Sequence, residues 1–439
     1  MHRLMLLLDG WGVLMDELHK KGRFDFSLFV SAIALWVIGI FLVYSATYIH
    51  QTGPLAGIFK QQIIWVLMAL MIVLAIVSIP GYIIFEGTYL LYGLSLALLV
   101  VAVATGVEAK GAERWIPIGG IRVQPSEFAK VGLLLALARY LGEKTVSLYR
   151  ISSFIVPGLL ILIPFGLVMK QPDLGTALVF CAMALPMFYW GGLTLLELFY
   201  IVSPGISLML SAIPLLLSYS SGTDWGFLEA APWGVFFLAV IAVLYFTRPP
   251  LFIWVGVIIT NLVASTAITI VWNSVLKDYQ KLRIISFINP QADPYGAGYQ
   301  VIQSKVAIGS GHIFGKGYLE GTQTRLSFLP EQHTDFIFSV LGEQFGVVGC
   351  SLVVFLFLFL IIRGFMVTQS VRNRYINLVA VGASSILAFH VFVNIAMTVG
   401  MMPVTGLPLP FLSYGGSFTI TVAVLVGLLL NARLTGQDF

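Results

Sequence analysis

Long apolar runs recur along almost the whole chain, and this pattern constrains the fold more than any other feature of the sequence. Each run contains about 20 residues, mostly Leu, Val, Ile, Phe and Ala, which is the length that an α-helix needs to cross a bilayer. A membrane β-strand needs only about half that length. Because backbone polar groups in lipid must be satisfied within the protein, the runs predict an all-α, polytopic membrane helical bundle.

Composition supports the same conclusion. Of the 439 residues, 59% are hydrophobic and 10% are charged, whereas an average soluble domain carries about 25% charged residues. The net charge of +4 is a weak indication of association with anionic lipid, and we expect no nucleic-acid partner. Cys181 and Cys350 lie in or beside apolar segments far apart in the chain, so we expect two free thiols rather than a disulfide.

Hydropathy predicts a single integral membrane domain, residues 1–439, with about twelve spans. The two weakest are Leu193–Ser218, which prolines interrupt, and Pro232–Phe246, which is short. The predicted spans are Ser27–Ala46, Gln61–Ile79, Ile83–Thr105, Ser126–Leu141, Ser152–Met169, Leu174–Trp190, Leu193–Ser218, Pro232–Phe246, Leu251–Trp272, Phe336–Ile362, Ile376–Gly400 and Pro408–Asn431.

Basic residues in the short connections predict the orientation. Cytoplasmic loops are enriched in Lys and Arg, and counting spans from a cytoplasmic N-terminus places most basic connections inside, together with the C-terminus. The segment Lys110–Arg122 is the main exception. The basic residues that fall inside are Lys20, Lys21, Arg23, Lys144, Arg150, Arg248, Arg363, Arg372, Arg374 and Arg433.

The stretch Asn273–Thr334 is the only large polar segment, and the same counting places it outside the cytoplasm. It is rich in Gly, Gln, Asn and charged residues. A connection of this length in a compact protein is usually functional or disordered. Its mixture of aromatic residues and glycines argues against simple disorder, so we predict a large extracytoplasmic catalytic loop over residues 273–334.

Several short strings combine polar residues, glycines and prolines in an unusual order. In the outer stretch they are Asn289–Gln300, Gly309–Gly311, Gly315–Gly317, Gly321–Thr324 and Phe328–Phe336, and elsewhere Arg114-Trp115, Gln124–Lys130, Lys170–Thr176 and Pro403–Ser417. These motifs resemble those of the SEDS family (shape, elongation, division and sporulation). Their residues are most similar to the RodA branch of that family. The resemblance covers nearly the whole chain.

The resemblance implies an activity and a partner. SEDS proteins of the bacterial inner membrane join lipid II disaccharides by β-1,4 glycosyl transfer, and the growing glycan stays attached to undecaprenyl pyrophosphate. They work with a class B penicillin-binding protein, a monofunctional transpeptidase. Asp293 aligns with the essential aspartate of the family. The family usually has ten spans, so residues 193–247 are expected to include an inserted pair of helices, which leaves the catalytic loop outside.

The reaction itself calls for one carboxylate. An inverting displacement of a sugar pyrophosphate by a sugar hydroxyl needs one base, predicted to be Asp293. The leaving diphosphate needs cations rather than an acid, and the loop supplies Lys305, Lys316 and Arg325. A divalent cation (Mg or Mn) is an alternative source of positive charge, although no His/Asp/Cys spacing resembles a dedicated metal site. On spacing alone, Asp293-Pro294 is also typical of a turn.

Ionisable residues at membrane depth mark a second group of candidates. Glu127 and Lys130 lie three residues apart, share a helix face and can pair. The resemblance implies a polar cavity in which Lys130 engages pyrophosphate, joined by Arg114. The alternatives are a structural ion pair and an interfacial arginine that snorkels to water. Glu343 lies on a span and needs a partner that the sequence does not identify.

The remaining candidates follow prolines or the re-entry of the loop into the membrane. Asp173 either caps the next helix or lines the substrate cavity. His333 either bonds within the loop or contacts substrate, and Asp335 is expected to cap a helix that starts at Phe336. The run around Ser413 suggests a kinked or re-entrant start to the last helix, where backbone amides either bind an anion or pack tightly.

Two other functions compete with polymerisation. A lipid II flippase should carry ionisable residues near the bilayer midplane between internal repeats, and the sequence contains no repeat. A non-catalytic scaffold for wall synthesis would tolerate changes in the loop unless they disturb partner binding. Most of the polar residues that could carry chemistry lie in the predicted outer loop, and this distribution favours the polymerase.

Overall fold

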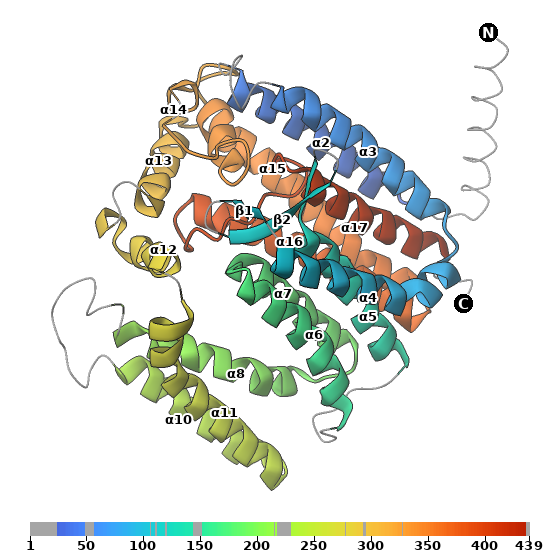
Figure 1. Ribbon diagram of the computed structural model, residues 1–439, viewed down its shortest axis with the longest axis vertical. Coiled ribbons are helices and arrows are strands. Elements are labelled where there is room, and N and C mark those ends of the chain that lie inside the picture. The colour runs from blue at the N-terminus through green and yellow to red at the C-terminus, as the bar shows by residue number, and fades with distance from the viewer. Residues whose placement is uncertain are drawn as a thin grey trace.

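The computed structural model describes residues 24–48, 57–105, 107–109, 112–118, 121–143, 152–214, 216, 230–276, 278–292, 296–326 and 328–435. Helices dominate these residues, and a helix overlaps each of the twelve predicted spans (Figure 1). The predicted all-α membrane bundle is therefore confirmed. Both cysteines are free, as expected.

The helices run through the described chain in this order: α2 (Phe26–Thr47), α3 (Ile58–Ser78), α4 (Gly81–Thr105), α5 (Pro125–Glu143), α6 (Ser152–Lys170), α7 (Leu174–Trp190), α8 (Leu195–Ser211), α10 (Ala231–Thr247), α11 (Leu251–Ile270), α12 (Asp278–Ile288), α13 (Ala297–Ser310), α14 (Thr322–Arg325), α15 (Ile337–Ser370), α16 (Arg374–Thr398) and α17 (Gly416–Thr435). A π-helix, η2 (Val271–Val275), extends α11, and a 3₁₀-helix, η3 (Pro290–Ala292), follows α12.

Seven of the described helices are long and apolar enough to cross a membrane: α2, α3, α4, α11, α15, α16 and α17. Four shorter apolar helices, α6, α7, α8 and α10, accompany them. Helix α5 carries Glu127, Lys130 and Arg139 and is less apolar, yet most of its residues are buried inside the bundle. The chain is therefore a polytopic membrane protein.

Helices α16 and α17 form the centre of the bundle, because 78% of the most apolar stretch of each is buried. Helix α17 packs along α3, and two glycines allow the close approach: a Cβ added at Gly416 would lie 2.5 Å from Trp65, and one at Gly427 would lie 2.9 Å from Ile76. At the far end of this contact, Asn431 donates from Nδ2 to the Ile76 carbonyl at 2.9 Å. These helices provide the rigid frame for the polar residues described below.

An ion cluster joins three helix ends at the side predicted to be cytoplasmic. Asp25 caps α2 by accepting a hydrogen bond from the Leu28 amide at 3.2 Å. Its carboxylate also pairs with Arg363 of α15 at 2.7 Å and with Arg433 of α17. The side chain of Asp25 is buried, so the cluster fixes α2, α15 and α17 relative to one another.

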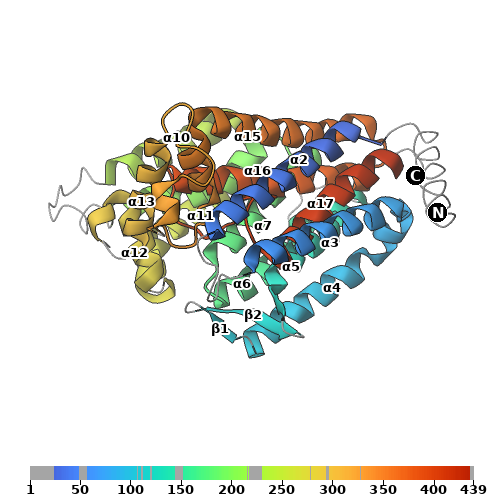
Figure 2. The same cartoon turned by 90° about the horizontal axis from the view of Figure 1, so that it is seen from above.

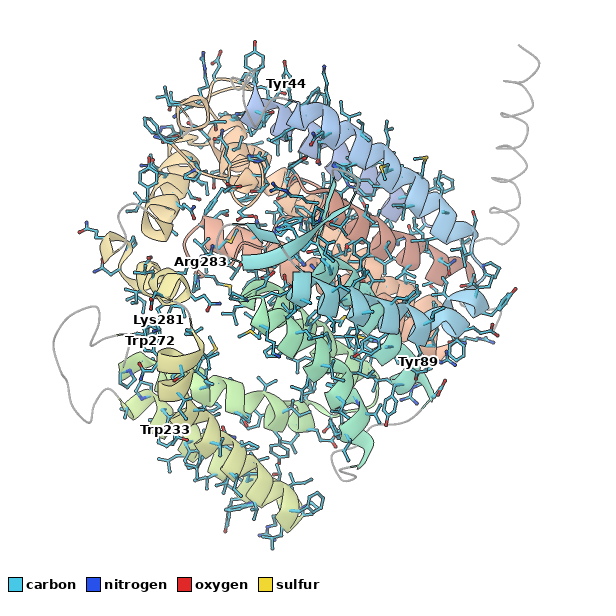
Figure 3. All side chains as sticks on the ribbon, in the orientation of Figure 1. Tyr44, Tyr89, Trp233, Trp272, Lys281 and Arg283 are labelled. Atoms are coloured by element: carbon cyan, nitrogen blue, oxygen red, sulfur yellow. The ribbon has the colours of Figure 1, made fainter. Side chains whose placement is uncertain are left out.

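Helices α8, α10 and α11 form a separate lateral group with its own small apolar core, at the lower left of Figure 1. Trp233 of α10 lies on this group (Figure 3). Inside it, the buried Asn261 donates to Ser203 at 2.9 Å and accepts from Ser207 at 2.6 Å. This polar contact joins α11 to α8. The idea that residues 193–247 contain an inserted pair stays a prediction.

A small sheet follows α4, where the sequence suggested only a connection. Strands β1 (Val107–Ala109), β2 (Ala112–Ile118) and β3 (Ile121–Val123) pair antiparallel in chain order. Figure 2 shows β1 and β2 beside the C-terminal end of α4. The β-branched residues of β3 favour this extended structure.

The predicted outer loop is largely helical. Helices α12, α13 and α14 and the short η3 occupy much of residues 273–334, and Figure 1 shows them along one end of the bundle. The many glycines of this stretch obscured the helical periodicity. The last helix begins at Gly416 rather than at Pro408, so its predicted span started too early. The suggested kinked or re-entrant start stays a prediction.

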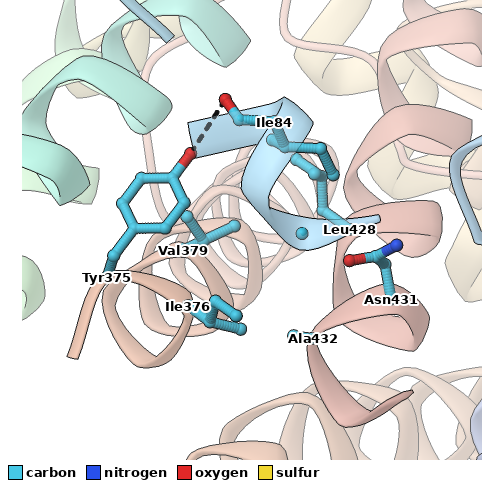
Figure 4. A pocket seen from close by; sticks show the side chains of 8 residues that line it. Ile84, Tyr375, Ile376, Val379, Leu428, Asn431 and Ala432 are labelled. Carbon is cyan, nitrogen blue, oxygen red and sulfur yellow. Dashed lines mark hydrogen bonds between the residues drawn. The ribbon is translucent and has the colours of Figure 1, made fainter. Parts of the chain in front are cut away.

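A small apolar pocket lies between α4, α16 and α17, at the end of the bundle opposite α12–α14 (Figure 4). Ile84, Tyr375, Leu428 and Asn431 are among the residues that line it. The pocket is narrow and almost wholly apolar, so it does not suit a sugar diphosphate.

Candidate functional site

Strings far apart in the sequence meet at the end of the bundle beside α12–α14. The Gln124 amide, just before α5, donates to the Ser417 hydroxyl of α17 at 3.1 Å. The Ser413 hydroxyl donates to the Thr334 carbonyl at 2.6 Å, and the Tyr414 amide donates to the His333 carbonyl at 2.9 Å. Three of the strings on which the resemblance depends are thus joined directly.

Lys130 lies at the centre of a fully buried polar cluster. Its Nζ donates to Glu127 Oε1 at 2.8 Å, which confirms that the two residues pair on one face of α5. The same Nζ lies 3.1 Å from His390 Nε2 on α16 and 5.5 Å from the centre of the Phe418 ring. Sequence reasoning missed His390, although a histidine inside an apolar span is itself a signal of function.

The contacts of His390 define its tautomer. A lysine ammonium can only donate, so His390 Nε2 accepts from it and Nδ1 carries the proton. Nδ1 lies 3.3 Å from the Pro408 carbonyl and donates to it. One turn further along α16, Asn394 donates from Nδ2 to the carbonyls of Leu407 at 2.8 Å and Asp335 at 2.9 Å. Helix α16 therefore holds the non-helical segment before α17 in place.

The buried cluster leaves polar atoms available. Within the described chain, Glu127 Oε2 has no hydrogen-bond partner. A buried polar atom without a partner is costly unless water or a ligand satisfies it. The free carboxylate oxygen can accept a hydrogen bond from a ligand, and the Lys130 ammonium has one N–H beyond the two directed at Glu127 and His390.

Lys316 and Glu343 are partners, which answers the question that the sequence left open for Glu343. Lys316 Nζ lies 3.1 Å from Glu343 Oε1 and donates to the Thr322 hydroxyl at 2.7 Å. The Glu343 side chain is fully buried, whereas Lys316 keeps part of its surface exposed. Lys316 is therefore held by a carboxylate instead of standing as a free cation.

The other two predicted loop cations lie elsewhere on the outer helices. Lys305 is exposed on α13 and crosses Gly400, where an added Cβ would lie 2.0 Å from Lys305 Cε. Gly400 has a φ of 76°, which favours glycine. Arg325 is exposed at the end of α14. Both side chains are therefore accessible at the surface of the protein.

Asp293 lies outside the described residues. The chain on either side is defined, since η3 ends at Ala292 and α13 begins at Ala297. The predicted roles of Asp293, as catalytic base or as part of a turn, therefore stay predictions. The backbone of Arg114 lies in β2, but its side chain is outside the described part, so its expected contact with Lys130 also stays a prediction.

Three other predicted residues have defined structural contacts. Asp173 is the N-cap of α7 and accepts from the Thr176 amide at 3.2 Å. The Ser413 hydroxyl, besides its bond to the Thr334 carbonyl, accepts from the Leu409 amide at 2.8 Å, which favours a role in packing. The His333 ring lies 6.0 Å from the Tyr414 ring. The expectation that Asp335 caps the next helix was wrong, because the N-cap of α15 is Phe336.

Arg283 on α12 is a further basic residue that sequence reasoning missed. Figure 3 shows it on the side of α12 that faces the bundle. Both Arg283 Nη1 and Asp335 Oδ2 lie near Gly406, at 4.0 and 3.7 Å from an added Cβ. The one feature of the sequence that could have identified Arg283 is its position shortly before the string that contains Asp293. Among the described residues, no group of three His, Cys, Asp or Glu is placed to hold a metal ion.

Comparison with known families decides the identity of the chain. The family model described as "Cell cycle protein", which covers FtsW, RodA and SpoVE, matches residues 26–222 and 230–437. The chain belongs to the FtsW/RodA/SpoVE family. The resemblance to SEDS proteins drawn from the sequence is thereby confirmed.

Individual members of this family align over almost their full length. The peptidoglycan glycosyltransferase RodA of Treponema pallidum is 35% identical, over 93% of this chain and 98% of its own. The peptidoglycan glycosyltransferase MrdB of Escherichia coli K12 is 34% identical, over 95% and 96%. One of these relatives is named RodA, in agreement with the resemblance to the RodA branch.

Solved structures agree with the family assignment. A chain from a peptidoglycan synthase complex, in which polymerisation and crosslinking are coordinated, is 29% identical with a TM-score of 0.65, covering 94% of this chain and 98% of its own. The crystal structure of RodA from Thermus thermophilus is 26% identical with a TM-score of 0.59, covering 94% and 97%.

Proposed function

We propose that this chain is a peptidoglycan glycosyltransferase that polymerises lipid II into glycan strands by β-1,4 transfer during cell elongation. The observation that carries the proposal is the convergence of the family strings around the buried Lys130, at the end of the bundle where α12–α14 gather. Relatives that share this chain over almost their whole length are named peptidoglycan glycosyltransferases.

Asp293 acts as general base in this proposal and removes the proton from the acceptor sugar hydroxyl. The undecaprenyl pyrophosphate of the donor strand leaves as an anion. Lys130 stabilises it from the buried cluster, while Arg114, Lys305 and Arg325 contribute from the outer face. Asp173 and His333 line the surrounding cavity, and Ser413 supports it by bonding to the Thr334 carbonyl and the Leu409 amide. A divalent cation (Mg or Mn) would supply further positive charge beside the leaving diphosphate, and among the described residues no group of three or more His, Cys, Asp or Glu is placed to hold one.

The membrane setting follows the distribution of basic residues. The protein lies in the bacterial inner membrane with both termini in the cytoplasm, and residues 273–334 face outside. A class B penicillin-binding protein is the proposed partner and crosslinks the product. A related chain in a peptidoglycan synthase complex supports this pairing.

Purified protein with its partner, supplied with lipid II, tests the proposal. Wild type should produce long glycan strands, whereas Asp293→Asn should reduce the rate about 100-fold or more, as expected for loss of a general base. Asp278→Asn on α12 is the matched control, because the side chain of Asp278 is 97% exposed and its ion pair with Lys281 spans 3.5 Å. Full polymerisation by Asp293→Asn would refute the assigned base.

A second arm separates polymerisation from lipid transport. The protein is placed in proteoliposomes with fluorescent lipid II, and transfer of the lipid between leaflets is followed. A polymerase should consume the lipid without accelerating its transfer. Rapid transfer that Asp293→Asn leaves unchanged, together with no polymer, would instead establish a flippase.

A further inference from the structure

Helix α15 is broken near its start, and a segment of the outer region fills the break. Gly346 has φ 61° and ψ −158°, a conformation outside the helical region. The break frees backbone groups on both sides of it. The segment that occupies it, residues 311–325, is here called the strap.

Four backbone hydrogen bonds join the strap to the break. The amides of Lys316 and Gly317 donate to carbonyls on the N-terminal side of the break, at 3.0 and 3.1 Å. The amides of Val347 and Val348 donate to strap carbonyls at 3.0 and 3.1 Å. The strap lies so close to α15 that only glycine fits at position 315, since a Cβ added at Gly315 would lie 2.1 Å from a carbonyl oxygen of α15.

The carboxylate of Glu343 adds a second, side-chain connection. Its Oε1 accepts from the Gln323 amide at 2.8 Å and pairs with Lys316 at 3.1 Å. Its Oε2 accepts from the Thr324 amide at 3.0 Å and from the Thr324 hydroxyl at 2.7 Å. Glu343 thus satisfies the first amides of α14, as an N-cap side chain would, although it belongs to another helix.

The strap continues directly from α13, and α13 begins shortly after Asp293. The same half of α15 that holds the strap also supports α13. Ser339 and Ser304 share a hydrogen bond of 2.6 Å, and a Cβ added at Gly342 would lie 3.0 Å from Ile308. Fixing the strap therefore fixes the C-terminal end of the helix that leads to Asp293.

We propose that Glu343 and Lys316 are positioning residues, whose buried ion pair latches the strap onto α15 and holds α13 in the orientation that glycosyl transfer requires. This inference rests on the proposed function and assigns Lys316 a role different from direct contact with diphosphate. A general base works only when it is held close to the reacting hydroxyl. Neither residue needs to touch the substrate.

Hydrogen exchange tests the latch without any activity. Full-length wild type, Glu343→Gln and Glu320→Gln are compared in detergent by mass spectrometry. Glu320 is the matched control, because it lies in the same strap and is exposed. A hydrogen bond to a charged group contributes about 1.5–3 kcal/mol, so Glu343→Gln should accelerate exchange of the Gln323 and Thr324 amides about tenfold or more. Unchanged exchange in Glu343→Gln would overturn the latch.

Kinetics with the partner test the positioning role. Glu343→Gln and Lys316→Met should each lower kcat, by up to about 100-fold if the base moves by an ångström, with little change in KM for lipid II. The double variant should lose no more than the worse single variant, because both residues act through one contact. Glu320→Gln should behave as wild type.

The two arms separate the possible failures. Multiplied losses in the double variant, together with a higher KM in Lys316→Met, would show direct substrate contact by Lys316 and overturn its positioning role. Normal kcat in both single variants would overturn the inference even if exchange changed. If Asp293→Asn remained active while the strap exchanged faster in Glu343→Gln, the latch would stand and the assigned base would fail.

Discussion

Replacement of Lys130 by methionine removes the only ammonium of the buried cluster and keeps most of the side-chain volume. Glu127 would then be a fully buried carboxylate that has lost its 2.8 Å partner, and its other oxygen already lacks one within the described chain. His390 Nε2 would lose its donor as well. Removing one member of a buried pair typically costs about 3–5 kcal/mol, so the unfolding equilibrium should shift by roughly two to four orders of magnitude.

A second variant separates stability from function. When Lys130→Met is combined with Glu127→Gln, no unpaired charge remains, and neutral replacements of a buried ion pair are often as stable as the original. We expect the double variant to recover most of the lost stability. Polymerisation should stay abolished, because the ammonium proposed to bind the diphosphate is still missing.

The assay is unfolding in mixed SDS and mild-detergent micelles, followed by circular dichroism, with lipid II polymerisation measured on the same preparations. Lys281→Met on α12 is the control, since its 3.5 Å pair with the exposed Asp278 is worth at most about 1 kcal/mol. The reasoning is refuted if Lys130→Met unfolds like wild type. It also fails if the double variant is no more stable than the single one.

Two further predictions concern backbone geometry and pH. Burial raises the pKa of Asp25, but hydrogen bonds from Ser27 and Arg363 lower it more, so its folded-state pKa lies below the ordinary 3.8. A lowered carboxyl pKa stabilises the fold above pH 3.8 and ceases to do so as the pH falls through the folded value. Asp25→Asn should therefore be less stable than wild type at pH 7, and the difference should close as the pH falls below 3.8, as measured by SDS unfolding over a series of pH values. Gly346→Ala should destabilise by about 3 kcal/mol or more, because its Cβ would lie 2.5 Å from a strap nitrogen, whereas Gly309→Ala on α13 meets open space and should be neutral in the same titration.

Local features of the chain were predictable because they depend on neighbouring residues. Apolar runs of the right length specified the spans, and the three-residue spacing of Glu127 and Lys130 specified their pairing on α5. The proline before Asp173 marked the start of α7, which Asp173 caps. The helices hidden in residues 273–334 were missed, because glycines weakened the periodic signal on which such predictions rely.

The arrangement of the site was decided by tertiary structure alone. His390 reaches Lys130 across 260 residues of sequence, and Glu343 finds Lys316 only because α15 breaks at Gly346 and admits the strap. Arg283 of α12 lies near Gly406, which is also distant in sequence. An apolar helix can pack against its neighbours in many rotations with nearly equal burial, so periodicity specifies which residues form helices. Which polar groups then meet depends on glycine contacts and hydrogen bonds between helices, and those exist only once the bundle has assembled.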